Sequence, residues 1–289
     1  MPTIKDVAKL AGVSTATVSN VLSGRRPVSA PLADQVRRAV DALGYQPNTV
    51  ARSLRDQRTH TIGVSVPDIT NPFFNGVVRA IDIAAHAAGY QVLLVSNNER
   101  REVERQRVDT LVARQVDGLV IAPRDDDVAY ADDLRRRRLP TVFLDRGSPT
   151  LPFDLVAVDN VAAAQAATRF LVGLGHRRIA ALATSTELRN IRERLTGFRQ
   201  ALRNAGLSVD ERLVATPGLE ARDAIPAARA LLTVDPPPTA VFCLTNNMAL
   251  HAMRAIHALG LDVPRQVSLL SFDEVDWASA MEPELTTVA

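Results

Sequence analysis

Residues 3–24 read TIKDVAKLAGVSTATVSNVLSG, and this stretch decides how the N-terminal part of the chain is interpreted. Thr3 and Asp6 have the spacing of a capping box at the start of a helix. Gly12 ends that helix, and Ser14 is placed to cap a second one. We therefore predict two short helices joined by a tight turn, which is the helix-turn-helix arrangement. The apolar residues of the first helix fall on one face: Ile4, Val7, Ala8 and Ala11.

The second predicted helix has an apolar stripe and an opposite face of small or polar side chains. Val18, Val21 and Leu22 make the stripe, and residues 15–17, 19 and 20 make the other face. Such a face can lie in a major groove, where an Asn pairs with adenine and an Ala methyl group contacts a thymine methyl group. We expect this helix to contact base edges through Thr15, Ala16 and Asn20.

A third amphipathic helix follows, with Ser29 placed to cap it, Pro31 in its first turn and Gly44 at its end. Residues 1–60 contain nine Lys or Arg and four Asp, a net charge of +5, whereas the whole chain carries +2 and residues 61–289 therefore carry −3. Basic charge gathered in one terminal module is typical of proteins that neutralise DNA phosphates. The alternative is a small helical bundle with a solvated basic surface.

The run from Ile4 to Leu22 resembles the DNA-binding headpiece of the lactose/galactose-repressor (LacI/GalR) family of bacterial transcription regulators. So does GYQPNTVARSL at 44–54, and the resemblance continues in order through NPFF at 71–74, VDG at 116–118, VDN at 158–160, GHRRI at 175–179 and PELTT at 283–287. It implies a helix-turn-helix domain at 1–46, a hinge at 47–59 and an effector-binding and dimerisation core at 60–289. The DNA-binding residues expected on this basis are Thr3, Ser14, Thr15, Ala16, Thr17, Asn20, Ser29, Asn48, Ala51, Leu54 and Arg55.

Within the hinge, the segment Pro47–Arg55 is too short to hold a helix alone in water, because helix nucleation is unfavourable and eight or nine residues gain few hydrogen bonds. The resemblance implies that it folds only on DNA, beside a partner hinge. It also implies that Leu54 enters the minor groove and kinks the duplex.

Residues 61–289 alternate short apolar strands with helices, which predicts parallel sheets covered on both faces. The pattern restarts after Pro149 and Pro152 with a strand-like run at 155–158. The expected fold class is α/β: a helix-turn-helix headpiece followed by two doubly wound parallel subdomains, at 60–147 and 148–285, as in periplasmic binding proteins. A crevice between the subdomains is the expected ligand site.

Ligands of open parallel sheets meet the loops at the carboxyl ends of strands. Several such loops carry acids, amides, an Arg or an aromatic ring, which suit sugar hydroxyls or the edges of a heterocycle. In the resembled family, the positions that match Phe74, Arg194 and Asp273 contact the effector. Alternatives remain: Phe73 or Phe74 as core, Asp68 as a turn cap and Arg194 as a surface ion-pair partner. The expected effector-binding residues are Asp68, Phe73, Phe74, Arg194, Asn246 and Asp273.

Two departures from the family leave the effector open among a sugar, a phosphorylated sugar, a nucleobase or none. No aromatic residue occurs at 218–220, and Asn246 stands where the family usually has Asp.

Composition excludes several other classes. No apolar run approaches the length of a membrane span, no signal peptide is recognised, and the single cysteine, Cys243, allows no intrachain disulfide. No Gly-rich phosphate loop follows a strand, and the five His lack metal-ligand spacing, so we expect no enzyme, cofactor or metal site. The rival interpretation is a two-lobed solute-binding protein without a DNA role, which the basic headpiece and the missing signal peptide oppose.

We therefore expect a cytoplasmic, homodimeric repressor that binds a pseudo-palindromic operator in double-stranded DNA under the control of a small effector, such as a sugar. The run at 284–289 is predicted to begin a strand, which in the resembled family crosses back into the first lobe. On this basis we expect a truncated regulator whose core is poorly stable, weakly dimeric and poor at effector binding. The alternative is that the sequence is a fragment of a longer chain.

Overall fold

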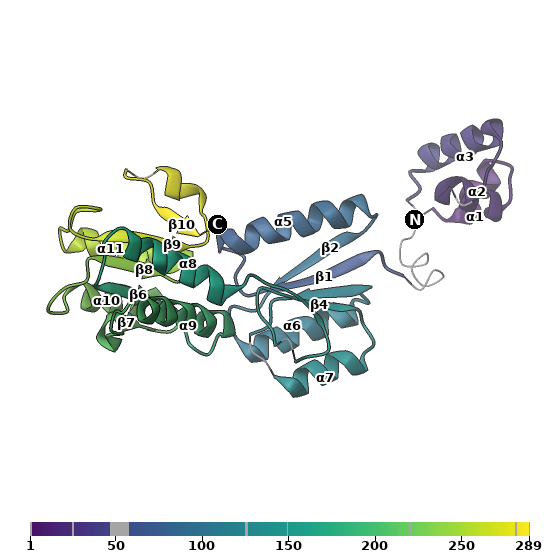
Figure 1. The fold of residues 1–289 in the computed structure, drawn as a ribbon. Coiled ribbons are helices and arrows are strands. Elements are labelled where there is room, and N and C mark those ends of the chain that lie inside the picture. The colour runs from purple at the N-terminus through teal and green to yellow at the C-terminus, as the bar shows by residue number, and fades with distance from the viewer. Residues whose placement is uncertain are drawn as a thin grey trace. The chain divides into compact units, whose positions relative to one another are not determined.

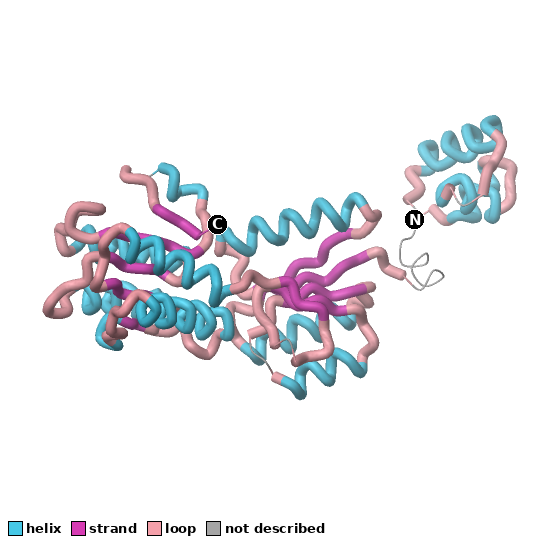
Figure 2. Tube along the Cα trace, in the orientation of Figure 1, coloured by secondary structure: helices cyan, strands magenta, loops and turns pink. Residues whose placement is uncertain are grey.

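The structure is a computed structural model of the 289-residue chain, and it describes residues 2–24, 26–46, 58–124, 127–148, 150–219, 221–280 and 282–288. Internal contacts divide the chain into two units, Met1–Thr59 and His60–Ala289. Figures 1 and 2 show a small helical N-terminal unit and a larger unit of two helix-covered sheets. Within the described residues, no helix is long and apolar enough to cross a membrane.

The N-terminal unit contains three helices, α1 (Ile4–Leu10), α2 (Thr15–Ser23) and α3 (Ala30–Leu43). Their apolar stripes meet in one small core, in which Val7, Val18 and Val36 are fully buried. Three short helices that each bury one stripe against the other two satisfy the packing requirement that none could meet alone. The predicted three-helix headpiece is therefore confirmed.

The helix ends of this unit agree with the predicted caps in two of three cases. The Asp6 carboxylate accepts hydrogen bonds from the Thr3 backbone N–H at 2.8 Å and from the Thr3 hydroxyl at 2.7 Å. Ser14 accepts one from the Thr17 backbone N–H at 3.0 Å, as expected of an N-cap. Ser29 stands at the N-cap position of α3 but its side chain makes no capping hydrogen bond, so that part of the prediction is wrong.

The first lobe of the larger unit is a five-stranded parallel sheet in the order β2-β1-β3-β4-β5. Parallel strands need a crossover connection, which is usually a helix, and helices provide it between the first four strands of this lobe. The elements are β1 (Thr61–Val66), α5 (Pro72–Ala87), β2 (Gln91–Ser96), α6 (Arg101–Ala113), β3 (Gly118–Ile121), α7 (Val128–Arg136), β4 (Thr141–Leu144) and β5 (Asp154–Val156).

The second lobe repeats this design with the strand order β10-β9-β8-β6-β7. All residues of β6 and β8 are buried, as expected of central strands with both faces covered. The elements are α8 (Asn160–Gly173), β6 (Ile179–Leu182), α9 (Arg189–Asn204), β7 (Val214–Ala215), α10 (Ala221–Leu232), β8 (Ala240–Cys243), α11 (Asn246–Ala258), β9 (Ser268–Phe272) and β10 (Thr286–Val288), with 3-10 turns at Glu211–Leu213 and Asp276–Ala280.

Two strands do not lie where the sequence analysis placed them. The strand expected to open the second subdomain, β5, pairs with β4 in the first sheet, with Val142 opposite Asp154 and Leu144 opposite Val156. The boundary at 147/148 is therefore wrong for this strand, because its backbone hydrogen-bond partners belong to the first lobe. The C-terminal strand β10 pairs with β9 in the second sheet, with Thr286 opposite Leu270, rather than crossing into the first lobe.

The helices α8 and α9 cover one face of the second sheet and pack closely against each other, and Gly197 of α9 lies directly against α8. A Cβ atom added at Gly197 would lie 2.3 Å from the Val161 carbonyl oxygen and 3.0 Å from the Ala164 Cβ. Glycine is required here because any side chain would push the two helices apart. This packing holds α9 in place, and α9 carries several of the polar residues described next.

Candidate effector-binding site and DNA-reading helix

A cavity of about 380 Å³ opens between the two sheets of the larger unit. Residues that follow β1, β2 and β4 line it from the first lobe, and residues that follow β6, β8 and β9 line it from the second. The carboxyl ends of both sets of parallel strands thus meet at one place, as open α/β sheets require of a ligand site. Five of the six predicted effector residues are on its wall: Asp68, Phe73, Phe74, Arg194 and Asp273.

Arg194 is almost completely buried, with 3% of its surface exposed, so the alternative of a surface ion pair is excluded. Its Nε donates to Asn160 Oδ1 at 2.9 Å and its Nη1 to the Leu244 carbonyl oxygen at 2.6 Å. Its guanidinium carbon lies 3.6 Å from the centre of the Phe272 ring. Burial lowers the pKa of Arg194, while Asp273, with Oδ1 at 3.9 Å from Nη2, opposes that shift.

Asp273 directly follows β9 and adopts a left-handed backbone conformation with φ of 66°. Burial raises the pKa of its carboxyl group, while Arg194 lowers it. Asp145, which follows β4, has a similar φ of 63°. Asp tolerates this conformation better than most residues, but it still costs backbone energy, and such positions gather at functional sites.

Two predicted residues have structural roles beside their place on the cavity wall. Phe74 is 6% exposed and belongs to a core cluster, and its ring meets that of Phe73 edge-on with centroids 5.0 Å apart. Asp68 accepts hydrogen bonds from the Thr70 backbone N–H and hydroxyl, both at 2.7 Å, and so also caps a turn. Phe74 and Asp68 therefore each have the structural role that the sequence allowed and also line the cavity.

Asn246 is the predicted residue that does not reach the cavity wall. It begins α11 and is 2% exposed. Its Nδ2 donates to Asn71 Oδ1 at 2.9 Å, which joins the second lobe to the first. Its neighbour Asn247 lies on the wall instead.

The sequence analysis missed several wall residues on the first-lobe side. Asn98 and Glu99 follow β2, and Asp145 and Arg146 follow β4. The rule that ligands meet the carboxyl ends of parallel strands applies equally to these two strands and would have found all four. From the second lobe, Thr184, Asn190 and His251 were also missed.

In the N-terminal unit, Thr15 and Ala16 are exposed on α2, and Asn20 and Thr17 are half-buried. Thr3, Ser14 and Ser29 are exposed near the helix starts. Polar and small side chains thus occupy the surface of α2 opposite buried Val18, as the predicted recognition face requires. The predicted DNA contacts of Asn48, Ala51, Leu54 and Arg55 lie outside the described residues.

No group of three or more His, Cys, Asp or Glu side chains in the described ranges is arranged to hold a metal ion. Cys243 is buried in the second sheet, and burial raises the pKa of its thiol. The thiolate is the reactive form, so this cysteine is an inert part of the core.

Comparison with known proteins agrees with both units. Residues 3–48 match the bacterial regulatory proteins of the lacI family, and residues 59–289 match the periplasmic binding proteins and sugar binding domain of the LacI family. This chain belongs to the LacI family. As a member, it is a DNA-binding transcriptional regulator with an effector-binding domain.

Among relatives of this LacI-family chain, the transcriptional repressor PurR of Vibrio atlanticus is 34% identical over 289 residues, covering 100% of this chain and 86% of the relative. The repressor CytR of Escherichia coli K12 is 35% identical over 287 residues, covering 99% and 84%. The Lac repressor dimer bound to operator and the anti-inducer ONPF superposes with a TM-score of 0.88 at 30% identity, covering 99% and 86%. The regulator CelR in complex with cellobiose superposes with a TM-score of 0.71 at 33% identity, covering 99% of this chain and 87% of that structure.

Proposed function

We propose that this LacI-family regulator is a homodimeric repressor whose α2 helices read the two halves of a pseudo-palindromic operator. The observation that carries the proposal is the exposed Thr15–Ala16 face of α2, a helix that packs into a buried three-helix core inside the basic part of the chain. A duplex groove admits such a helix, and paired headpieces make operator symmetry follow protein symmetry. The domain division that we propose is 1–46, 47–59 and 60–289.

The proposed contacts fall into two classes. Thr15, Ala16 and Asn20 touch base edges, where a hydrogen-bond pattern or a methyl group distinguishes sequences. The others position the headpiece on phosphates or fill the minor groove from the hinge, and these carry little sequence information directly. They are Thr3, Ser14, Thr17, Ser29, Asn48, Ala51, Leu54 and Arg55.

The outer face of the first lobe suits the proposed dimer. Ile83 on α5 is 61% exposed, and Leu93 and Leu94 on the edge strand β2 are 37% and 38% exposed. Most other residues of α5 are exposed or half-buried, although the helix is rich in Ala, Val and Ile. Apolar surface gathered on one helix and an unpaired strand edge is costly in water and is relieved by association with a second copy.

The proposed effector is a small molecule bound in the cavity between the lobes. Asp68, Phe73, Phe74, Arg194 and Asp273 supply polar groups beside a flat aromatic surface. Because the cavity is built from both lobes, a bound molecule contacts both and favours their closed arrangement. Coupling between effector and operator must then be reciprocal. We further propose that the protein catalyses no reaction and acts in the cytoplasm, where its DNA partner lies.

The direct test is selection of operator sequences from random duplex DNA, followed by fluorescence anisotropy with the selected duplex over a range of salt concentrations. A palindromic sequence, two chains per duplex and an affinity that falls steeply with salt are expected. Weak binding without sequence preference at every salt concentration would reject the proposal.

The matched control is Asp273→Asn. This substitution changes the cavity between the lobes and leaves the N-terminal unit unaltered, so it should retain operator binding while losing the response to an effector. Loss of operator binding in a folded Asp273→Asn protein would contradict the proposed separation of roles.

A further inference from the structure

Several buried polar atoms of the cavity wall have no hydrogen-bond partner within the described part of the chain. They include Glu99 Oε2, Arg146 Nε and Arg146 Nη1 from the first lobe, and the hydroxyls of Thr184 and Thr245 from the second. A buried polar group without a partner costs about 1–3 kcal/mol, so a polar ligand that reached this cluster would gain hydrogen bonds from atoms that the protein itself does not pair.

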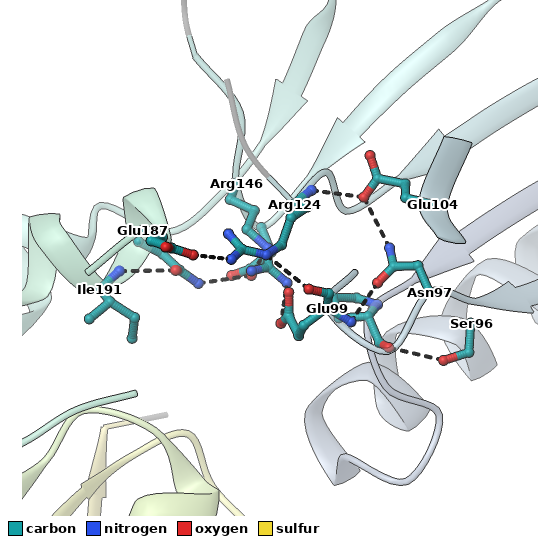
Figure 3. A network of polar contacts seen from close by, with 11 residues as sticks. Ser96, Asn97, Glu99, Glu104, Arg124, Arg146, Glu187 and Ile191 are labelled. Carbon is teal, nitrogen blue, oxygen red and sulfur yellow. Dashed lines mark hydrogen bonds and ion pairs between the residues drawn. The ribbon is translucent and has the colours of Figure 1, made fainter. Parts of the chain in front are cut away.

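Glu99 and Arg146 form the best-defined pair in this cluster. Arg146 is 4% exposed, and its Nη2 donates to Glu99 Oε1 at 2.8 Å. Figure 3 shows the pair inside a network that continues through Arg124 to Glu187 of the second lobe and through Asn97 to Glu104. The network fixes both side chains, so their unpaired donors and acceptor stand in place before any ligand arrives.

Both arginines of the cavity are already neutralised by carboxylates. Arg146 Nη2 pairs with Glu99, and its Nε is 3.8 Å from Asp145 Oδ2. Burial lowers the pKa of Arg146, but Glu99 and Asp145 outweigh that effect and hold it above the ordinary value. Arg194 has Asp273 beside it, and its Nε and Nη1 donate hydrogen bonds to the Asn160 side chain and the Leu244 carbonyl oxygen.

The cavity wall as a whole has an excess of negative charge. Its acids are Asp68, Glu99, Asp145 and Asp273, and its arginines are Arg146 and Arg194. A phosphate group placed in the cavity would meet four carboxylates and two cations that are already paired, inside a site of low dielectric constant. Like charges repel strongly under those conditions. Hydroxyl groups, by contrast, both donate and accept, and can satisfy the orphaned atoms without adding charge.

We propose that the effector is an uncharged polyhydroxylated molecule, and that Glu99 and Arg146 together bind adjacent hydroxyl groups of it and exclude its phosphorylated form. The pair offers two free donors beside one free acceptor, which is the pattern that a vicinal diol matches. The inference rests on the proposed effector site and adds its ligand class and two residues that determine specificity.

The primary experiment measures ligand binding to the unmodified protein, without DNA, by calorimetry and thermal shift. The probes are matched pairs: D-ribose with ribose 5-phosphate, D-glucose with glucose 6-phosphate, and cytidine and guanosine with their 5′-monophosphates. Cellobiose and the free bases cytosine and guanine complete the set. We expect an uncharged hydroxylated probe to bind at least about tenfold more tightly than its phosphorylated partner. The arms distinguish a free sugar from a nucleoside as the source of the hydroxyl groups.

A second measurement assigns the selectivity to the pair. Glu99→Gln keeps the shape of the side chain and removes one charge, so it should weaken the uncharged probe about tenfold and narrow its advantage over the phosphorylated partner. The control is Glu102→Gln, because Glu102 is an exposed acid in the first turn of α6 that lies off the cavity wall. That control should change neither the affinity for the uncharged probe nor its advantage over the phosphorylated partner.

Three outcomes would overturn the inference: a phosphorylated probe that binds as tightly as its partner, a free base that binds more tightly than its nucleoside, or no binding by any probe. An unchanged selectivity in folded Glu99→Gln would remove the pair from the site. Operator binding is measured separately, so a protein that binds DNA but prefers phosphorylated ligands would retain the proposed function and lose only this inference.

Discussion

The side-chain amide of Asn190 donates a hydrogen bond to Asp145 Oδ2 at 3.0 Å and thereby ties α9 of the second lobe to the end of β4 in the first. Both residues are buried, at 7% and 8% exposure, and both line the cavity. Together with the Asn246–Asn71 hydrogen bond and the Arg124–Glu187 ion pair, this bond holds the lobes together at the ligand site. The same polar groups therefore serve lobe closure and the cavity wall.

Asn190→Ala removes the donor and leaves the buried Asp145 carboxylate with one partner fewer. We expect the free energy of unfolding to fall by about 1–3 kcal/mol, and effector affinity to fall because the closed arrangement loses a contact. Denaturant unfolding and calorimetry measure the two effects. Asn204→Ala, at the exposed end of the same helix, is the control and should change neither. Equal stability of Asn190→Ala and the native protein would show that the bond is replaced by water.

Asn20→Ala should relax base preference at one position of each operator half-site, with a loss of about 1–3 kcal/mol in discrimination. Asn20 is the strongest hydrogen-bonding side chain on the proposed recognition face of α2. Selection from random duplexes followed by sequencing measures the change. Gln35→Ala, an exposed amide on α3, is the control and should leave the selected sequence unaltered. If Asn20→Ala also leaves it unaltered, α2 is not the reading helix.

Leu54→Ala should reduce DNA bending and specific affinity while the larger unit keeps its stability. The expectation comes from a lone Leu within a polar hinge segment, where a wedge between base pairs would give it a role. Circular-permutation gel shifts at matched occupancy measure the bend. Ser53→Ala is the neighbouring control, and a bend angle equal in Leu54→Ala and the control would reject the wedge.

The alternation of apolar strands and helices was enough to predict both sheets, because a strand buried on both faces must be apolar throughout. It could not say which sheet β5 joins, since Asp154–Val156 is a three-residue strand at an edge and edge pairing depends on tertiary contacts. The two-residue strand β7 was too short to give any pattern.

The predicted site residues come from loops after four strands. They were chosen by the rule that ligands meet the loops at the carboxyl ends of parallel strands, and this rule applies to every strand of a parallel sheet. Glu99 and Arg146 were not predicted as wall residues because no sequence motif marks the loops after β2 and β4. Their pairing with each other, 47 residues apart, depends on packing that no local pattern encodes.

Gly197→Ala should destabilise the second lobe although Ala favours helices by about 1 kcal/mol over Gly. The new methyl group would lie 2.3 Å from the Val161 carbonyl oxygen, which is backbone and cannot turn aside. Separation of α8 from α9 is expected to cost about 1–3 kcal/mol, and more if the sheet shifts with them. Gly173→Ala, at a helix position with open space around it, is the control and should be neutral or stabilising. Thermal unfolding measures both, and equal stabilisation by the two substitutions would contradict the close packing.

Asp273→Asn should change how stability depends on pH. Burial raises the pKa of Asp273 above its ordinary value of 3.8, with Arg194 opposing the shift. An acid whose pKa is higher in the folded state contributes stability that is fully present below pH 3.8 and is lost as pH rises through the folded pKa. The variant has no group that titrates there. The stability of the native protein relative to Asp273→Asn should therefore fall as pH rises across this window. Denaturant unfolding at a series of pH values measures the difference, with Phe74→Leu, which removes no titrating group from the same cavity, as the control. A difference that rises with pH would mean that Arg194 outweighs burial and that the pair favours the charged carboxylate.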